Sequence, residues 1–263
     1  MNSLLEDLGK SLRQSEFWAY STWLDIVTRY RRLHLGMVWA LVPPLVYIFG
    51  LGYMYSGISA SRQNYHFVLH LGLGWALWRM TTSVINDASG IYVSHKAFIL
   101  DGRTCLTDYL LRAMAKALFH FFFAFAVVLV VMLWESSVHW QNMLTLLVTI
   151  PVYLFNLLWL AVVVSLLGTR FPDIREFIST MLMFGFFLTP ILWIAQALPP
   201  GSMRGTVARL NPAFHFVEMV RAPIMGFPVE TASLIVVACM SVGGWLLAIW
   251  LYRRYARFVP LWM

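Results

Sequence analysis

Six long runs of apolar residues, separated by short polar segments, occupy most of the chain between Leu35 and Tyr252. Each run holds about 20 or more mostly apolar residues, the length that a helix needs to cross a hydrocarbon core of about 30 Å. The runs are Leu35–Tyr55, His66–Ile85, Leu106–Trp134, Met143–Gly168, Phe177–Leu198 and Thr231–Tyr252. A strand of an outer-membrane barrel would instead alternate apolar and polar positions over about ten residues. The pattern predicts an all-α integral membrane protein with six transmembrane helices, organised as a single transmembrane domain over residues 1–263.

Residues 17–33, before the first run, have two different faces at helical spacing. The apolar face consists of Tyr20, Trp23, Leu24, Val27 and Tyr30, and the polar face of Ser21, Asp25, Arg29 and Arg32. Aromatic residues opposite arginines are typical of a helix that lies in the lipid headgroup plane. We therefore expect an amphipathic interface helix, which either anchors the orientation of the chain or docks a cytoplasmic partner, and one helix can do both.

Residues 94–103, between the second and third runs, form a short amphipathic segment that ends in an Asp101-Gly102 turn signal. Two interpretations stay open. The segment is either a plain loop that supplies positive charge, or the coupling loop of a transporter that a separate motor subunit drives.

Residues 199–228, between the fifth and sixth runs, are unusually apolar for a loop. Asn211 followed by Pro212 predicts a helix start, with Asn as the N-cap and Pro at the first helical position. Glu218 and Arg221 are three residues apart and form a helix-stabilising pair. The apolar positions in this helix include Phe214, Phe216, Val217 and Val220. The segment predicts short re-entrant helices that gate an exit, or alternatively a helix on the surface of the loop.

Composition narrows the class of protein. The 263 residues are 60% hydrophobic and 12% charged, whereas an ordinary soluble domain is about 45–50% apolar and about 25% charged. This excludes a soluble enzyme, a disordered chain and a nucleic-acid-binding domain. The net charge of +7 is not one basic patch, because the Lys and Arg residues fall into short clusters between the apolar runs.

The distribution of these cations predicts the orientation of the chain. Of the 19 Lys and Arg residues, 14 lie in the N-terminal segment, the second loop and the adjoining start of the third run, the fourth loop and the C-terminal tail, 4 lie in the first and fifth loops, and Arg79 lies within a span. Cytoplasmic loops carry the excess of Lys and Arg. Both termini are therefore predicted to be cytoplasmic.

Arg79 lies in the second run, with Trp75, Thr82 and Asn86 on roughly the same helix face. A charge inside a span is costly and usually faces protein or a water-filled path. The face is either a polar and aromatic wall of a substrate route, or the site of an arginine that extends to the cytoplasmic headgroups. Trp75, Trp78, Arg79 and Thr82 are the candidate substrate-channel residues.

The sequence offers no catalytic or metal site. Gly9-Lys10-Ser11 resembles the end of a phosphate-binding loop, but Leu4 stands where that loop needs glycine, so we do not expect this chain to be an ATPase. His66 and His70 lack a third ligand nearby and are interpreted as polar residues at the membrane interface. The two cysteines are far apart in the sequence, which argues against a disulfide framework.

Several stretches, in order along the chain, resemble the permease subunit of type-2 ABC exporters of lipid-linked polysaccharide, the exporters of O-antigen, capsule and teichoic-acid chains. Residues 23–39 are similar to the family's RDIKxRYRxxxLGxxW pattern, and Phe171-Pro172-Asp173-Ile174-Arg175 resembles its RFRD segment after the fourth span. Residues 187–193 (FLTPILW) resemble FFLSPIxW, and Asn211, Pro212, Glu218 and Arg221 match NPxxxxxExxR. Two features depart from the family: residues 96–104 lack the prolines of KxxFPxxxLP, and Arg79 stands where the family usually has an uncharged residue.

This resemblance implies a homodimer in the bacterial cytoplasmic (inner) membrane, with two copies of a cytoplasmic ATPase subunit that binds ATP and Mg, and no cofactor on this chain. It implies outward export of an undecaprenyl-pyrophosphate-linked polysaccharide for lipopolysaccharide biosynthesis through a channel between two protomers. The implied ATPase-contact residues are Arg29, Arg32, Ser94, His95, Lys96, Ala97, Phe98, Ile99 and Leu100. The implied gate residues are Asn211, Pro212, Phe214, Phe216, Glu218 and Arg221.

Two other classes of function fit the sequence less well. An ion-coupled secondary transporter usually has carboxylates within its spans, broken mid-span helices or internal repeats, and the deep spans of this chain lack Asp and Glu. A membrane enzyme that acts on lipid phosphates needs several metal-binding aspartates at helical spacing, and only Asp101-Gly102-Arg103 faintly resembles such a motif.

Overall fold

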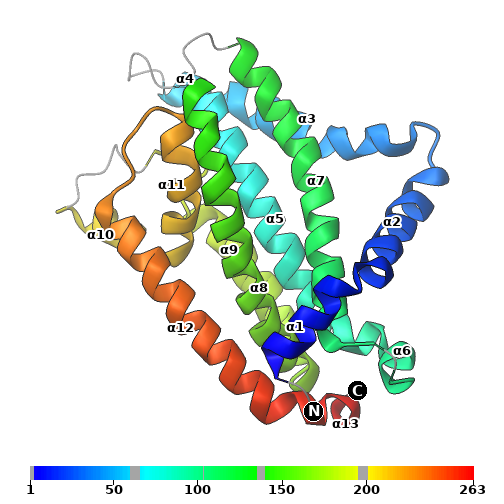
Figure 1. Ribbon diagram of the computed structural model, residues 1–263. Helices are drawn as coiled ribbons and strands as arrows, with labels where there is room; N and C mark the ends of the chain where they lie inside the picture. The colour runs from blue at the N-terminus through cyan, green and yellow to red at the C-terminus, as the bar shows by residue number, and fades with distance from the viewer. Residues whose placement is uncertain (1–2, 60–65, 103, 135–139, 195–200) are drawn as a thin grey trace.

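The computed structural model describes residues 3–59, 66–102, 104–134, 140–194 and 201–263, and this part of the chain contains helices and no strands. The centre of the bundle is α5 (Phe67–Ser94), which packs against both α7 (Leu106–Trp134) and α8 (Leu146–Arg170). The long helix α12 (Thr231–Tyr255) packs against the outer side of α8 (Figure 1). The all-α class is as predicted.

Four helical stretches in the described residues are long and apolar enough to cross a membrane: Gly36–Tyr55, Leu106–Trp134, Gln141–Arg170 and Thr231–Trp262. These four correspond to the first, third, fourth and sixth predicted runs. Helix α5 contains the second run and is long enough, but it carries Arg79 and Asp87 and is less apolar. Most of its side chains pack against other helices, which allows a central helix to carry more polar residues. The count of six spans stays a prediction.

The fifth run was predicted as one helix over Phe177–Leu198, and this prediction is wrong. Helix α9 covers Asp173–Leu188 and is only 16 residues long. It ends because Thr189 has an extended backbone, with φ −81° and ψ 136°, the conformation favoured before a proline such as Pro190. Residues 189–194 form a turn, and the rest of the predicted run lies outside the described residues.

The first run is helical but irregular. It consists of the 3₁₀ helix η1 (Gly36–Leu41), the short helix α3 (Val42–Leu45), the π-helical turn η2 (Val46–Leu51) and α4 (Gly52–Ser59). Pro43 and Pro44 explain the interruption, because neither has an N–H to continue the helical hydrogen bonds. The segment lies against α5 with its direction reversed: η2 lies beside Gly72, and α4 begins beside Val68.

The interface helix was predicted over residues 17–33 and is α2 (Ser15–Arg31). It packs along α7: Asp25 forms an ion pair with Arg112 at 2.5 Å, and the Tyr30 hydroxyl lies 3.1 Å from His120 Nε2. Arg112 is near the start of α7 and His120 is near its middle, so α2 lies along the first half of α7 (Figure 1). The α2 residues that are buried are Thr22, Ile26 and Tyr30, whereas Tyr20, Trp23 and Leu24 of the predicted apolar face are exposed. The position of α2 in the headgroup plane stays a prediction.

A helix that the sequence pattern did not predict, α1 (Leu4–Arg13), precedes α2. It begins with a capping box, in which the Ser3 hydroxyl accepts from the Glu6 N–H and the Glu6 carboxylate accepts from the Ser3 N–H. Its Leu4 and Leu8 side chains are buried. Helix α1 contacts α7 and α12 and so joins the two sides of the bundle.

The remaining short helices lie near the two ends of the bundle. Helix α6 (Lys96–Leu100) follows α5 and contacts α13 (Val259–Trp262), which follows α12 and η5 (Ala256–Phe258). Both ends of the chain are at this end of the molecule (Figure 1). Helices α10 (Met203–Leu210) and α11 (Pro212–Ile224) lie nearer the other end, where α11 contacts η3 (Trp140–Thr145).

Candidate functional site

The four candidate channel residues lie on one surface of α5. Trp75, Trp78, Arg79 and Thr82 all line a cavity of about 670 Å³, which we call the α5 groove. Its walls come from the first span and from α9. Aromatic residues on these walls are Tyr47, Tyr55, Phe186 and Phe187. Arg79 is the one charged residue among the described residues that line the groove.

Both tryptophans of the groove are firmly packed. The Trp75 ring stacks on Tyr47 with 5.2 Å between ring centroids, and Trp78 lies 6.4 Å from Phe186. Their exposed fractions are 6% and 8%. Arg79, in contrast, is exposed, and its carbonyl accepts a hydrogen bond from the Thr82 hydroxyl at 3.1 Å. The groove therefore has a packed aromatic surface with a single exposed cation.

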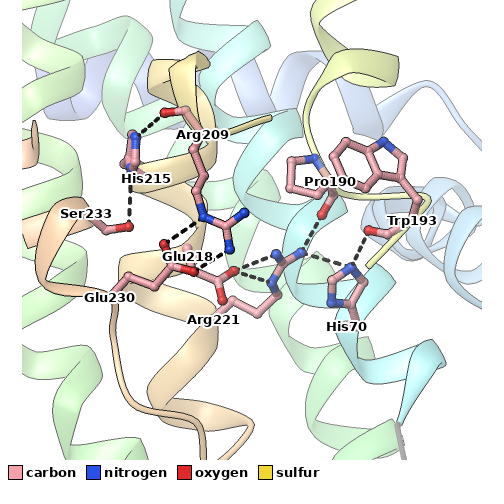
Figure 2. Close-up of polar contacts among 9 residues, drawn as sticks. All are labelled: His70, Pro190, Trp193, Arg209, His215, Glu218, Arg221, Glu230 and Ser233. Atoms are coloured by element: carbon pink, nitrogen blue, oxygen red, sulfur yellow. Dashed lines mark hydrogen bonds and ion pairs between the residues drawn. The ribbon is translucent and has the colours of Figure 1, made fainter. Parts of the chain in front are cut away.

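The predicted gate residues Glu218 and Arg221 form a buried ion pair inside α11, shown in Figure 2. Arg221 Nη2 and Nε donate to Glu218 Oε2 at 2.6 and 3.2 Å, and Nη1 donates to the Pro190 carbonyl at 2.6 Å. The same Nη1 lies 3.1 Å from His70 Nε2. Arg221 is 1% exposed. We call this cluster the Arg221 latch, because it holds α11 against α5 and against the turn that follows α9.

His70 corrects an expectation from the sequence. It was interpreted as a polar residue at the membrane interface, but it is completely buried, and its Nε2 also lies 3.1 Å from the Trp193 carbonyl. Gly74, one turn further along α5, lies beside the same cluster: a Cβ placed there would be in ordinary contact with Arg221 Nη1 at 3.5 Å. Local spacing does not predict the contact between His70 and Arg221, because the two residues are 151 positions apart.

A second polar cluster ties α10 and α11 to the start of α12. Arg209 donates to both Glu230 oxygens, at 2.8 and 3.2 Å. His215 Nε2 donates to the Arg209 carbonyl at 2.7 Å, and its Nδ1 lies 2.9 Å from the Ser233 hydroxyl (Figure 2). The two short helices are therefore fixed to both sides of the bundle by polar contacts.

The predicted start of the gate helix is confirmed. Asn211 is the N-cap of α11, its Oδ1 accepts from the Ala213 N–H at 3.0 Å, and Pro212 occupies the first helical position. Asn211 Nδ2 also donates to the Thr189 hydroxyl at 2.9 Å. Phe214 is buried, and the half-buried Phe216 packs edge-on against Tyr153. The gating role of these residues stays a prediction.

The candidate ATPase-contact residues form two groups. At the end of α5, Ser94, Lys96, Ala97, Phe98 and Leu100 are exposed, His95 is half-buried and Ile99 is buried. Lys96 Nζ donates to the Met263 carbonyl at 2.6 Å, so α6 is held against the C-terminal residues. Arg29 and Arg32 line a different cavity beside α7, of about 530 Å³, together with Lys116. Their contacts with a partner stay predictions.

Cys105 lies just before α7, at the same end of the bundle as α6. Its N–H donates to the Asp108 carboxylate at 2.8 Å. Partial burial raises the pKa of the Cys105 thiol above its ordinary value, and the nearby carboxylates of Asp7 and Asp108 raise it further. The thiol is therefore mostly protonated at neutral pH.

No group of three or more His, Cys, Asp or Glu residues within the described ranges is arranged to hold a metal ion.

Comparison with known proteins adds two findings. The sequence profile of the ABC-2 type transporter family matches residues 17–225. The O-antigen export system permease protein RfbA of Myxococcus xanthus is 25% identical to this chain over 209 residues, which cover 75% of this chain and 76% of RfbA.

Proposed function

We propose, from the premise that this chain belongs to the ABC-2 type transporter family as a membrane-spanning permease subunit, that it exports a polysaccharide linked to undecaprenyl pyrophosphate. The similarity to an O-antigen export permease supports a polysaccharide cargo. The observation that carries the proposal is the α5 groove, in which Trp75 and Trp78 lie beside Arg79. Family membership also argues against the two alternatives, an ion-coupled carrier and a lipid-phosphate enzyme.

In this proposal the α5 groove is half of a channel, and a second copy of the chain supplies the other half. The faces beside the groove support this arrangement. Helix α9 has no buried residue along its length, and Val46, Tyr47 and Phe49 of the first span are exposed. A second copy that covered these faces would bring two grooves together.

The aromatic lining suits the movement of a glycan. The CH groups of a sugar stack on an aromatic surface while its hydroxyl groups keep contact with water. Such contacts are individually weak and repeated, and transport requires binding that is weak enough for the cargo to leave. The groove has aromatic residues on α5 and on both walls, so a chain of sugars would meet similar surfaces along its path.

The energy in this proposal comes from ATP on a separate cytoplasmic subunit that contacts α6. Phe98 and Leu100 are exposed there and can pack against a partner. A displacement of α6 would pass directly into α5. The residues from His70 to Ser94 span about 36 Å at 1.5 Å per residue, so one helix joins the ATPase end, the groove and the Arg221 latch. The chain lies in the bacterial cytoplasmic membrane with both termini in the cytoplasm.

The double substitution Trp75→Ala and Trp78→Ala tests the channel. Export of the glycan to the outer face of the membrane should fall at least about tenfold, since the substitutions remove two rings of the groove and a loss of about 1.4 kcal/mol of interaction along the path lowers a rate tenfold. Co-purification of the ATP-binding subunit should stay unchanged. The matched control is Trp250→Ala, because Trp250 is exposed on α12 away from the groove. Normal export by the double variant would remove these residues from the mechanism.

A further inference from the structure

A second cavity, of about 580 Å³, lies between the end of α2, the first span, α5 and α7. We call it the basic cavity, because Arg29, Arg79, Lys116 and His120 line it. Arg79 also lines the α5 groove, so the two cavities meet at this side chain. Arg29 comes from α2, Arg79 from α5, and Lys116 and His120 from α7, so the cluster exists only in the folded chain.

The charges in the basic cavity are not balanced. Lys116 Nζ lies 3.2 Å from Asp87 Oδ2, and this is the one carboxylate among the described lining residues. His120 Nδ1 donates to the Lys116 carbonyl at 2.8 Å, and its Nε2 lies 3.1 Å from the Tyr30 hydroxyl. Neither Arg29 nor Arg79 has an ion-pair partner within the part of the chain that the structure describes. The three cations therefore exceed the carboxylates by two charges.

The position of Arg79 makes this imbalance costly. Arg79 lies about 18 Å from the start of α5 and about 22 Å from its end, at 1.5 Å per residue. In the predicted second span, a cation at this position needs a counter-ion or water. The surrounding walls include Trp39, Trp75 and Phe121, which suit an apolar chain. Cations beside an apolar wall match a lipid that carries a phosphate group.

We propose that the basic cavity binds the phosphate group of a membrane lipid, with Arg29 and Arg79 as the residues that contact it. Guanidinium groups form paired, charge-assisted hydrogen bonds with phosphate oxygens, and basic pockets between membrane helices bind lipid headgroups. The aromatic wall contacts the hydrocarbon chain of the same lipid. The phosphate comes either from an anionic phospholipid of the bilayer or from a polyprenyl pyrophosphate. Lipid binding here does not depend on the proposed export of a glycan.

Native mass spectrometry of the purified full-length chain in detergent tests this site with four probes. Undecaprenyl pyrophosphate is compared with undecaprenol, which has the same chain without phosphate, and dioleoylphosphatidylglycerol is compared with dioleoylphosphatidylcholine. We expect undecaprenyl pyrophosphate to bind at least about tenfold more tightly than undecaprenol, the value of one charge-assisted hydrogen bond or more. If phosphatidylglycerol displaces undecaprenyl pyrophosphate and binds with equal affinity, the site belongs to bilayer phospholipid. If phosphatidylglycerol does not displace it, the site belongs to the pyrophosphate carrier.

The double substitution Arg29→Gln and Arg79→Gln should weaken binding of the preferred lipid at least about tenfold. Arg29→Lys with Arg79→Lys should restore part of the affinity, which a purely structural role would not explain. Arg253→Gln is the matched control, because Arg253 is exposed at the end of α12 and outside the cavity. The proposal would be overturned if the double Gln variant bound the preferred lipid as tightly as the Arg253→Gln control. It would also be overturned if undecaprenol bound as tightly as undecaprenyl pyrophosphate. Either result would leave the export function to be judged by glycan export alone.

Discussion

Arg221 and Glu218 are buried together in α11, with exposed fractions of 1% and 3%. Removing two charges from water is expensive, and their attraction offsets that cost only when the geometry is good and other hydrogen bonds are made. Arg221 meets this condition through Glu218, the Pro190 carbonyl and His70. The latch therefore makes the position of α11 depend on α5 and on the turn after α9.

Replacing Arg221 by Met should lower the free energy of unfolding by about 3–5 kcal/mol, because the substitution removes the cation of a buried ion pair and leaves the Glu218 carboxylate in the interior. Arg209→Met is the control. It breaks the Arg209–Glu230 pair, whose side chains are 19% and 35% exposed, and partly exposed pairs contribute only about 0–1 kcal/mol. The measurement is unfolding of the purified chain in detergent by SDS titration.

The double variant Glu218→Leu with Arg221→Met separates charge from shape. It should recover part of the lost stability, since no unpaired charge remains in the protein interior. Equal destabilisation by Arg221→Met and Arg209→Met would show that the latch contributes no more than a surface pair.

The sequence predicted the spacing of Glu218 and Arg221 but not their surroundings. Residues three apart on a helix are neighbours whatever the fold, so the pair follows from the local pattern. Its burial and its contacts with His70 and Pro190 depend on how α5, α9 and α11 assemble. His70 was misjudged for the same reason: the neighbours on its own helix say little about what packs against it.

The contact between α8 and α12 depends on one glycine. A Cβ at Gly244 would lie 2.2 Å from the Trp159 ring, whereas a Cβ at Gly243 would meet nothing within 4 Å. Trp159 is buried, and its Nε1 donates to Asn156 Oδ1 at 3.0 Å, so the ring is not free to turn away. Small residues allow this close approach of membrane helices.

Gly244→Ala should therefore lower the free energy of unfolding by about 1–3 kcal/mol, the usual cost of overpacking a well-filled interior. Gly243→Ala should leave stability unchanged or raise it by up to about 1 kcal/mol, because alanine favours the helix more than glycine. The same SDS titration measures both. Loss of stability in the Gly243 variant, or its absence in the Gly244 variant, would contradict this packing.

The predicted boundaries are accurate where apolar content alone decides them. The third run was predicted as Leu106–Trp134, which is the extent of α7, and the sixth was predicted to start at Thr231, where α12 begins. The predicted boundaries are wrong where proline alters the backbone. Pro190 ends α9 early, and Pro43 and Pro44 interrupt the first span. Helix α1 was missed although the Ser3–Glu6 capping box was present in the sequence.

In the whole molecule, α5 connects the end of the bundle that carries α6 with the groove that is proposed as the transport path. The ends of the chain, α6 and α13 lie together at one end of the bundle (Figure 1), and the distribution of Lys and Arg along the sequence predicts that this end is cytoplasmic. The candidate channel residues could be predicted to share a face of α5, because helical spacing is a local property. The walls that α9 and the first span add to the groove could not.

Cys105 can test the predicted orientation, since it lies at the end of the bundle that should face the cytoplasm. In a Cys239→Ser variant, a membrane-impermeant maleimide should label Cys105 in inside-out vesicles and not in intact cells. The thiolate is the reactive form, and the pKa of Cys105 is raised. Labelling should therefore be slow at neutral pH. As the pH is raised toward the pKa of Cys105, the labelling rate should increase by up to about tenfold for each pH unit.

A cysteine at the opposite end provides the control for this orientation. Met203 is 86% exposed on α10, so Met203→Cys in a chain without Cys105 and Cys239 should be labelled in intact cells. Cys105 and Met203 lie toward opposite ends of the bundle, so a maleimide added outside the cell should label a cysteine at position 203 and not Cys105. Labelling of Cys105 from outside would reverse the predicted orientation, and it would place α6 where a cytoplasmic ATPase cannot reach it.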